Sequence, residues 1–299
     1  MDTAVELATE PLGASQVRLI ANTMRHDIIR MLEASGSGHP GGSLSAADIM
    51  ATLFFGGVLR YDHKSPNDHT RDRFFLSKGH AAPVLYATFH QLGWLSDEDM
   101  GTLRKLGSKL QGHPDNHACP GLEICSGSLG QGLSVGCGAA LGMRMDAKRQ
   151  KSAPYRVYVL CGDGEMQEGS NWEALMFAAH RGLDNLTMML DLNNLQIDGH
   201  VTDICSLGDV PAKLAAFGWN VQVIDGHDVA AIKGALTKAA DIKGSPQAIV
   251  CCTVKGKGVS FMEDQQGWHG KAPNAEQAAT ALAELDAERT RLEKEANNG

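Results

Sequence analysis

The feature that most restricts the fold of this chain is a regular alternation of apolar runs and helical patterns after Pro154. Each apolar run is short, and the helices expected between them are 7 to 13 residues long. The expected strands are 156–161, 186–192, 219–224 and 248–254, and the expected helices are 170–181, 211–217 and 229–241. Strands that alternate with helices build βαβ units, so the sequence predicts an α/β fold: a parallel β-sheet flanked by helices on both faces. Open sheets of this kind bind ligands at the carboxyl ends of their strands.

The first half of the chain is predicted to be mainly helical. The spacing of apolar residues predicts helices over 15–34, 45–55, 80–92 and 128–150, and a short apolar run lies at 74–76. A charged C-terminal helix is expected from about residue 275, as a solvated or packing element. The sequence contains no evident linker and no internal repeat, so residues 1–299 are expected to form a single domain.

Charge and composition argue against several classes of protein. The 27 basic and 35 acidic residues give a net charge of −8, which argues against nucleic acid and against a membrane surface as partners. The longest apolar runs are far shorter than the ~20 residues that cross a bilayer, and residues 1–12 lack the basic start of a secretory signal. A cytoplasmic protein is therefore expected. The seven cysteines include no C-x-x-C pair, and most are interpreted as reduced, inert side chains among apolar residues.

Two polar motifs follow consecutive strands of the predicted sheet. Gly162-Asp163-Gly164 comes directly after the strand 156–161, and Asn193 follows the next strand. Adjacent parallel strands would bring the Asp163 carboxylate and the Asn193 amide oxygen to one point, and such hard oxygen ligands suit Mg²⁺ or Ca²⁺. Because Mg²⁺ completes its shell with waters and phosphate oxygens, the pair suits a metal-bridged diphosphate. Either residue alone could be a helix cap or a turn residue, but their spacing on consecutive strands favours the metal site.

The segment that contains these motifs resembles the thiamine diphosphate signature, with GDG at 162–164 and NN at 193–194. In detail it is similar to the version found in transketolases. Further transketolase-like motifs surround His39 (SGHPGG), His80 (LSKGH), His113 (GHPD), Gly127 (GSLGQG) and His269 (HG). They occur in the family's order over roughly residues 15–275. The resemblance implies the thiamine diphosphate-binding fold of the diphosphate-binding (PP) domain.

The resemblance also implies roles for individual residues. Asp163, Asn193 and the backbone carbonyl of Leu195 would bind Mg²⁺, or Ca²⁺ or Mn²⁺ in its place. Thiamine diphosphate would contact a larger set of residues, namely His80, Gly127, Leu129, Gly162, Gly164, Glu165, Asn193, Ile197 and His269. Catalytic histidines would act on the hydroxyl and carbonyl oxygens of the sugars, and they would be His39, His113 and His269.

Glu168 and the other histidines complete the assignments. In transketolases the glutamate that matches Glu168 lies at the dimer contact and joins two active sites, so it is also assigned a catalytic role. Its alternative interpretation is a first-turn glutamate favoured by the helix dipole. Histidines outside the motifs are interpreted as structural side chains: His26, His63, His90, His117, His180, His200 and His227.

The resemblance covers one half of a transketolase site. In the family, the glutamate that activates the cofactor belongs to a pyrimidine-binding domain that follows the diphosphate-binding domain, and no second α/β unit follows Val254. The resemblance therefore implies the N-terminal subunit of a split transketolase, with a separate C-terminal subunit as partner and an α2β2 assembly. The reaction would be the reversible transfer of a two-carbon ketol unit from a ketose or its phosphate to an aldose or its phosphate.

Two other functions are considered for the same motifs. The alpha subunit of a thiamine-dependent 2-oxoacid dehydrogenase shares the signature but does not need histidines for sugar hydroxyls. A non-catalytic, cofactor-binding scaffold subunit would have no reason to keep the loop histidines and the metal ligands. Departures from the family pattern at Gly42-Ser43, Ser128 and Trp268 lie near the expected substrate channel. The substrate could accordingly be a sugar phosphate or a branched, sulfonated or otherwise modified sugar.

Overall fold

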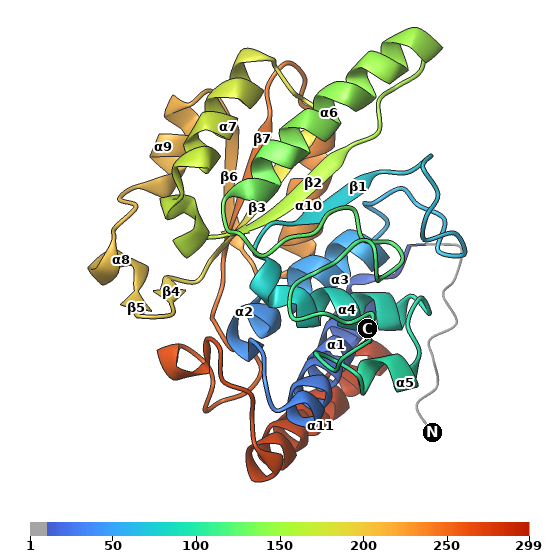
Figure 1. Cartoon of the computed structure of the whole chain (residues 1–299), viewed down its shortest axis with the longest axis vertical. Helices are drawn as coiled ribbons and strands as arrows, with labels where there is room; N and C mark the ends of the chain where they lie inside the picture. Colours follow the sequence, from blue (N-terminus) through green and yellow to red (C-terminus); the bar gives the residue numbers. More distant parts are fainter. Residues whose placement is uncertain (1–10, 299) are drawn as a thin grey trace.

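The computed structural model describes residues 11–298, so the exclusion of a secretory signal, which rests on residues 1–12, lies almost wholly outside the described residues. Five strands form one parallel sheet in the order β1-β2-β3-β7-β6 (Figure 1). These are β1 (Arg73–Leu76), β2 (Val157–Gly162), β3 (Leu186–Leu192), β6 (Asn220–Asp225) and β7 (Gln247–Cys252). A two-stranded antiparallel pair, β4 (Leu195–Gln196) and β5 (Gly199–His200), follows β3 and precedes the short helix α8 (Val201–Ile204).

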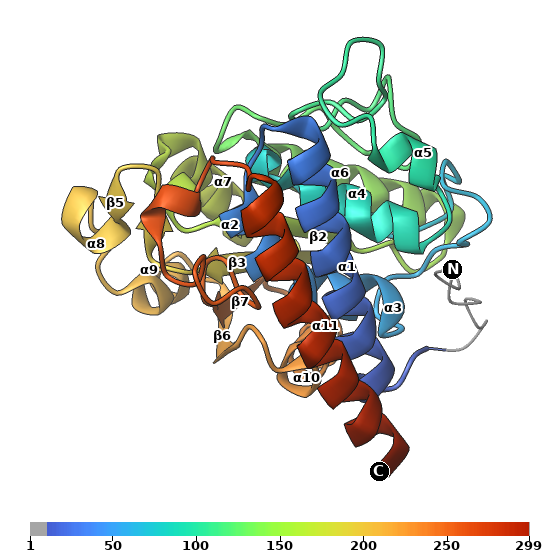
Figure 2. The same cartoon turned by 90° about the horizontal axis from the view of Figure 1, so that it is seen from below.

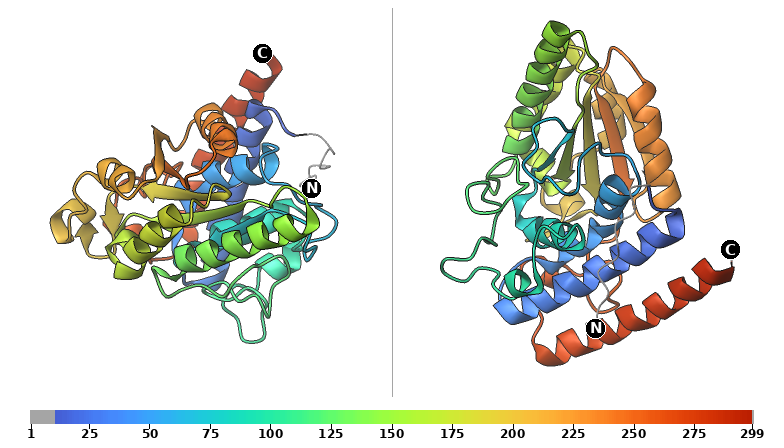
Figure 3. Two further views of the ribbon diagram at one scale, coloured as in Figure 1. Left: turned by 90° about the horizontal axis from the view of Figure 1, so that it is seen from above. Right: turned by 90° about the vertical axis from the view of Figure 1, so that its right-hand side faces the viewer.

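Helices cover both faces of this sheet, and Figure 3 shows the sheet between the two helical layers. One layer contains α1 (Ala14–Ser35), α3 (Ala47–Phe55), α4 (Ala82–Gln91) and α10 (Val229–Asp241). The other contains α6 (Gln131–Gln150), α7 (Gly169–His180) and α9 (Val210–Ala216). In β2, Tyr158 packs into the first layer and Val159 into the second, because successive strand residues point to opposite faces. The predicted α/β fold with helices on both faces is confirmed.

The connections place a ligand-binding crevice at the middle of the sheet. The chain advances from β1 through β2 to β3 by way of α6 and α7, which lie on one face. From β6 it returns to β7 through α10, on the opposite face, because right-handed crossovers that run in opposite directions put their helices on opposite faces. From β3 the chain first passes beyond β7 to the edge strand β6, through α9, and only then turns back, so the connection that leaves β3 and the one that enters β7 lie on opposite faces. Where neighbouring strands have connections on opposite faces, a crevice opens at their carboxyl ends.

Most predicted bounds lie within one residue of the structure, and four elements differ by two residues or more. The helix predicted over 45–55 begins at Ala47 as α3, and a separate short helix that was not predicted, α2 (Pro40–Ser45), precedes it. Pro40 occupies the first position of α2, where its missing N–H costs nothing. The helix predicted from residue 128 begins at Gln131, because Gly130 adopts a left-handed φ of 83°. The strand predicted to reach Val254 ends at Cys252. The helix predicted over 80–92 corresponds to α4, whose first residues form the separate short helix η1 (Gly79–Ala81), and the short helix α5 (Asp97–Met100) was not predicted.

The C-terminal helix α11 (Ala275–Asn298) lies along α1, as Figure 2 shows from below. Its apolar residues Ala278, Ala281 and Leu285 are buried in the same core as α1. The helix is therefore a packing element of the domain. Among the described helices, none is apolar over a stretch long enough to span a bilayer.

Candidate cofactor and metal site

A cavity of about 330 Å³ opens at the carboxyl ends of β2 and β3. Its walls come from loops that are far apart in the sequence, and they contain all but one of the residues assigned to the site. These wall residues are His80, His113, Gly127, Leu129, Gly162, Asp163, Gly164, Glu165, Glu168, Asn193, Leu195, Ile197 and His269. His39 stands beside the cavity, with its ring centroid 5.4 Å from that of His80 and 5.6 Å from that of His269.

Asp163 lies at the end of β2, next to the loop that follows β3. The two strands are parallel neighbours in register, with Gly162 opposite Asp191. The Asp163 carboxylate is 3% exposed and accepts hydrogen bonds from the backbone N–H groups of Gly164 (2.7 Å) and Asn194 (2.5 Å). Asn193 is also buried. The adjacent strands therefore bring these two side chains to one loop junction, as the spacing of the motifs predicts.

The donor atoms at this junction suit a hard cation. Burial and the nearby Asp191 raise the pKa of Asp163 to about 6, although the two backbone donors and the Lys255 ammonium favour the ionised form of this carboxyl. The buried ammonium of Lys255 donates a hydrogen bond to the Leu195 carbonyl at 2.5 Å, so a cation already lies against one of the predicted metal ligands. Burial lowers the pKa of Lys255 to about 8. Carboxylate, amide and carbonyl oxygens together match the ligands that Mg²⁺ prefers.

The floor of the cavity is a buried ion pair that the sequence analysis missed. The ammonium of Lys78 contacts the Asp191 carboxylate and donates a second hydrogen bond to the Gly42 carbonyl at 2.8 Å. Asp191 also accepts hydrogen bonds from the hydroxyls of Ser45 and Thr253. Burial opposes ionisation of Asp191, but the Lys78 ammonium holds the pKa of this carboxyl below its usual range. The pair joins α2 to the carboxyl ends of β1, β3 and β7.

Glu165 connects three loops around the cavity. Its carboxylate is 2% exposed and accepts hydrogen bonds from Ser77 Oγ (2.5 Å), Gly130 N (2.9 Å) and Gly162 N (3.0 Å). Burial raises the pKa of this carboxyl, while the donors favour the ionised form. Both carboxylate oxygens of Glu165 thus accept hydrogen bonds from the chain, so this residue holds the loops of the cavity wall together. Its predicted contact with a cofactor stays a prediction.

The predicted site histidines gather at the mouth of the cavity. The ring of His80 stacks on that of His269, with centroids 5.2 Å apart, and His39 lies 6.3 Å from His113. Burial lowers the pKa of His39 to about 4 and that of His269 to about 3, and it lowers the pKa of His80 well below its usual range. At neutral pH these rings are uncharged, so each can donate one hydrogen bond and accept another.

Two cations near these histidines were not found from the sequence. Lys255 Nζ lies 2.8 Å from His269 Nδ1, and the Arg104 guanidinium lies 3.5 Å from His39 Nδ1. Both cations contribute to the low pKa of the histidine beside them. Lys255 lies in the loop after β7, at the edge of the sheet where parallel strands present functional side chains, so its position in the sequence was an available signal. Arg104 lies in an irregular segment that carries no such signal.

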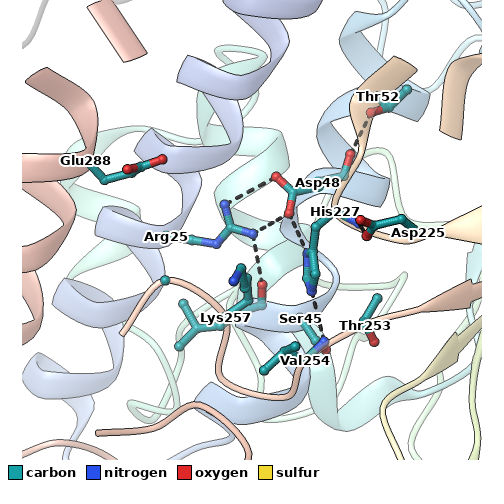
Figure 4. A network of polar contacts seen from close by, with 12 residues as sticks. Arg25, Ser45, Asp48, Thr52, Asp225, His227, Thr253, Val254, Lys257 and Glu288 are labelled. Carbon is teal, nitrogen blue, oxygen red and sulfur yellow. Dashed lines mark hydrogen bonds and ion pairs between the residues drawn. The ribbon is translucent and has the colours of Figure 1, made fainter. Parts of the chain in front are cut away.

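A network of polar contacts holds the segment after β7 at Val254, which precedes Lys255 in the sequence (Figure 4). Arg25 and the Nδ1 of His227 both contact the Asp48 carboxylate, and the Nε2 of His227 accepts a hydrogen bond from Val254 N at 2.9 Å. Both ring nitrogens of His227 are therefore engaged by the chain, in keeping with its predicted structural role. Arg25, Asp48 and His227 line a larger cavity of about 570 Å³, but there they contact one another, so we assign the ligand site to the smaller cavity.

Acidification is expected to destabilise the folded chain partly through His39. Its folded-state pKa of about 4 lies below the value of 6.5 expected when unfolded, so the unfolded chain binds the proton first as the pH falls through 6.5. Unfolding is thereby favoured between pH 6.5 and about 4. The urea midpoint should fall less between pH 7 and pH 5 in His39→Gln than in the wild type. The exposed His180 on α7 provides the control, since His180→Gln should keep the wild-type pH dependence. Equal pH dependence of all three proteins would contradict this explanation.

Comparison with known proteins agrees with the site. The family described as "Transketolase, thiamine diphosphate binding domain" matches residues 16–291. Transketolase-like protein 2 of Bos taurus is 46% identical over 275 residues, which cover 89% of this chain and 42% of that protein. The 6-deoxy-6-sulfo-D-fructose transketolase subunit SqwG of Clostridium sp. (strain MSTE9) is 40% identical over 268 residues, which cover 90% of this chain and 95% of that subunit.

Solved structures lead to the same family. The crystal structure of transketolase from Campylobacter jejuni superposes with a TM-score of 0.82 and 31% identity, over 95% of this chain and 48% of that one. The chain thus spans less than half the length of that enzyme and of the bovine relative. These findings support the transketolase prediction and not the 2-oxoacid dehydrogenase alternative. The chain belongs to the transketolase family and contains its thiamine diphosphate-binding domain.

Proposed function

We propose that this chain is the thiamine diphosphate-binding subunit of a split transketolase, and that a second polypeptide carries the pyrimidine-binding domain. The observation that carries the proposal is the convergence of Asp163, Asn193, Leu195 and the loop histidines on one cavity. The near-complete coverage of the Clostridium subunit supports the division into two polypeptides, because that relative is named as a subunit and is matched over 95% of its length. In this proposal, residues 1–299 form one diphosphate-binding domain.

The cavity residues divide into a cation-binding group and a sugar-binding group. Asp163, Asn193 and the Leu195 carbonyl would bind a divalent metal that neutralises a diphosphate. When bound, thiamine diphosphate supplies the electron sink for breaking a carbon–carbon bond. His39, His113 and His269 would accept and return hydroxyl protons of the sugar, a task that suits neutral imidazoles. The exposed side chain of Ile197, 64% accessible, provides an apolar surface on which a ring would pack.

The outer face of α6 and α7 supports the prediction of a partner. Several large apolar side chains on these two packed helices are exposed, namely Val135, Met145, Met176 and Phe177. Large exposed apolar side chains on two packed helices are typical of an interaction surface. Glu168, at the start of α7, lies between this face and the cavity that it lines. We therefore place the contact with other subunits along α6 and α7, and the α2β2 stoichiometry and a cytoplasmic location stay predictions.

The substrates are proposed to be a ketose donor and an aldose acceptor. The named substrate of the Clostridium relative is a sulfonated fructose, and the departures from the family pattern at Ser128 and Trp268 are next in sequence to Leu129 and His269, which line the cavity. A sulfonated or otherwise modified ketose is therefore a candidate beside the ordinary ketose phosphates. Either donor would give up the same two-carbon unit, because the difference lies at the far end of the sugar.

Reconstitution tests this proposal. The chain is purified alone and together with a polypeptide that contains a pyrimidine-binding domain, and ketol transfer is measured with thiamine diphosphate and Mg²⁺ for phosphorylated and sulfonated ketoses. Activity is expected only when both chains, the cofactor and the metal are present. Full activity of the isolated chain would contradict the split enzyme. Cofactor binding by the complex without turnover of any ketose would identify a scaffold subunit instead.

A further inference from the structure

A cluster of metal-ligating side chains lies in the long loop between α5 and α6, outside the cofactor cavity (Figure 1). It consists of Asp115, His117 and Cys125, whose Oδ1, Nδ1 and Sγ atoms approach one another closely. The sequence analysis interpreted His117 as structural and most of the cysteines as inert. Cys125 is exposed, however, and its sulfur faces polar groups rather than an apolar core: Asp115 Oδ1, His117 Nδ1 and, at 3.0 Å, the amide Oδ1 of Asn116.

The separations of the three atoms match the edges of a zinc tetrahedron. Ordinary Zn–S, Zn–N and Zn–O bonds in tetrahedral geometry place sulfur about 3.5 Å from nitrogen or oxygen, and nitrogen about 3.3 Å from oxygen. Here Cys125 Sγ lies 3.7 Å from His117 Nδ1 and 3.3 Å from Asp115 Oδ1. The Nδ1 and Oδ1 atoms are 3.1 Å apart. Each edge is within a few tenths of an ångström of the value for a bound ion, so little movement would be needed to form the site.

We propose that Asp115, His117 and Cys125 bind a Zn²⁺ ion. On binding, the Cys125 thiol releases its proton to solvent, and the His117 ring adopts the tautomer that leaves the Nδ1 lone pair free. The thiolate and the carboxylate then balance the charge of the ion, and the fourth position is open to water. The mixed sulfur, nitrogen and oxygen donors select Zn²⁺ over Mg²⁺, which takes oxygen ligands such as those proposed around Asp163.

The site lies within the loop, next to a point where two of its segments are joined by a backbone hydrogen bond. Ser126 N donates a hydrogen bond to the Pro114 carbonyl at 3.1 Å. Ser126 follows Cys125 in the sequence and Pro114 precedes Asp115, so this bond closes the segment that carries the three ligands. On the far side of this bond, the His113 ring packs on Gly127, where an added Cβ would lie 3.0 Å from His113 Cγ. His113 and Gly127 both line the cofactor cavity. A Zn²⁺ ion would thus clamp the loop next to the cavity mouth.

Zinc binding by the full chain tests the proposal, with Zn²⁺ alone as the probe and competition against a chromophoric chelator as the measurement. One Zn²⁺ per chain is expected, and Co²⁺ in its place should give the charge-transfer absorption of a thiolate ligand. Cys125→Ser and His117→Gln should each weaken the affinity at least about tenfold. Both side chains are exposed, so circular dichroism should show that the variants keep the wild-type fold.

Two further variants separate this site from other sources of binding. Cys205 is another exposed, free cysteine, and Cys205→Ser should bind Zn²⁺ as the wild type does. Asp163→Ala should also keep the zinc site, because the proposed magnesium ligands are a different set. Equal zinc affinity of the wild type and Cys125→Ser, or a cobalt complex without thiolate absorption, would overturn the proposal. The outcome is independent of the proposed transketolase activity, since binding to the chain alone is measured.

Discussion

Asp163→Ala is expected to abolish metal-dependent cofactor binding while leaving the chain folded. Asp163 is the only carboxylate among the three proposed metal ligands, so its loss removes the negative charge that would attract the cation. We expect a loss of roughly 10²–10³-fold or more in thiamine diphosphate affinity in the presence of Mg²⁺, in line with the several kcal/mol that a bound metal ion supplies. Cofactor affinity is measured by isothermal titration with the chain and its proposed partner, with and without Mg²⁺.

Removal of the metal should reproduce the effect of this substitution. The wild type in the presence of a chelator and Asp163→Ala with Mg²⁺ should bind the cofactor with similar, low affinity. Asp203 is an exposed aspartate on α8, so Asp203→Ala provides the matched control and should bind normally. Unchanged affinity of Asp163→Ala would show that the metal is held elsewhere. The far-ultraviolet spectrum should stay that of the wild type, because the lost hydrogen bonds are confined to two adjacent loops.

Lys78→Met is expected to destabilise the chain by about 3–5 kcal/mol, because it leaves the Asp191 carboxylate buried without a cation. The side chains of Lys78 and Asp191 are 1% and 0% exposed, so water does not replace the lost partner. The hydroxyls of Ser45 and Thr253 remain as donors, but neither carries a charge. The measurement is urea unfolding of the isolated chain near neutral pH, followed by circular dichroism.

Two comparisons separate the buried charge from a general effect of substitution. The double variant Lys78→Met with Asp191→Leu removes both charges and is expected to regain a large part of the lost stability. Arg18→Met breaks an ion pair with Glu295 whose side chains are 38% and 39% exposed, and should cost less than about 1 kcal/mol. If Lys78→Met unfolds at the wild-type urea concentration, the Lys78–Asp191 pair does not hold the floor of the cavity.

The sequence alone was sufficient for the strands β2, β3, β6 and β7, for most of the helices and for the position of Asp163 and Asn193, whereas β1 was recognised only as a short apolar run. Period-two and helical patterns are local, so strands such as 186–192 were correctly placed without knowledge of their neighbours. Boundaries were less accurate where one backbone conformation decides them, as at Gly130, because the left-handed φ of a single residue carries no periodic signal. The motif residues were brought together because the carboxyl ends of parallel strands meet at one edge of the sheet.

Only the tertiary structure decided which polar groups face one another. Lys78 and Asp191 are 113 residues apart, and neither motif nor periodicity relates them. The same holds for Lys255 and the Leu195 carbonyl, which are 60 residues apart, and for Asp48 and His227, which are 179 residues apart. Even the loop cluster around Cys125 depends on a turn that brings its sulfur back to Asp115. A local pattern specifies which face of an element is buried, whereas the partner of a buried charge is specified by packing between elements distant in the sequence.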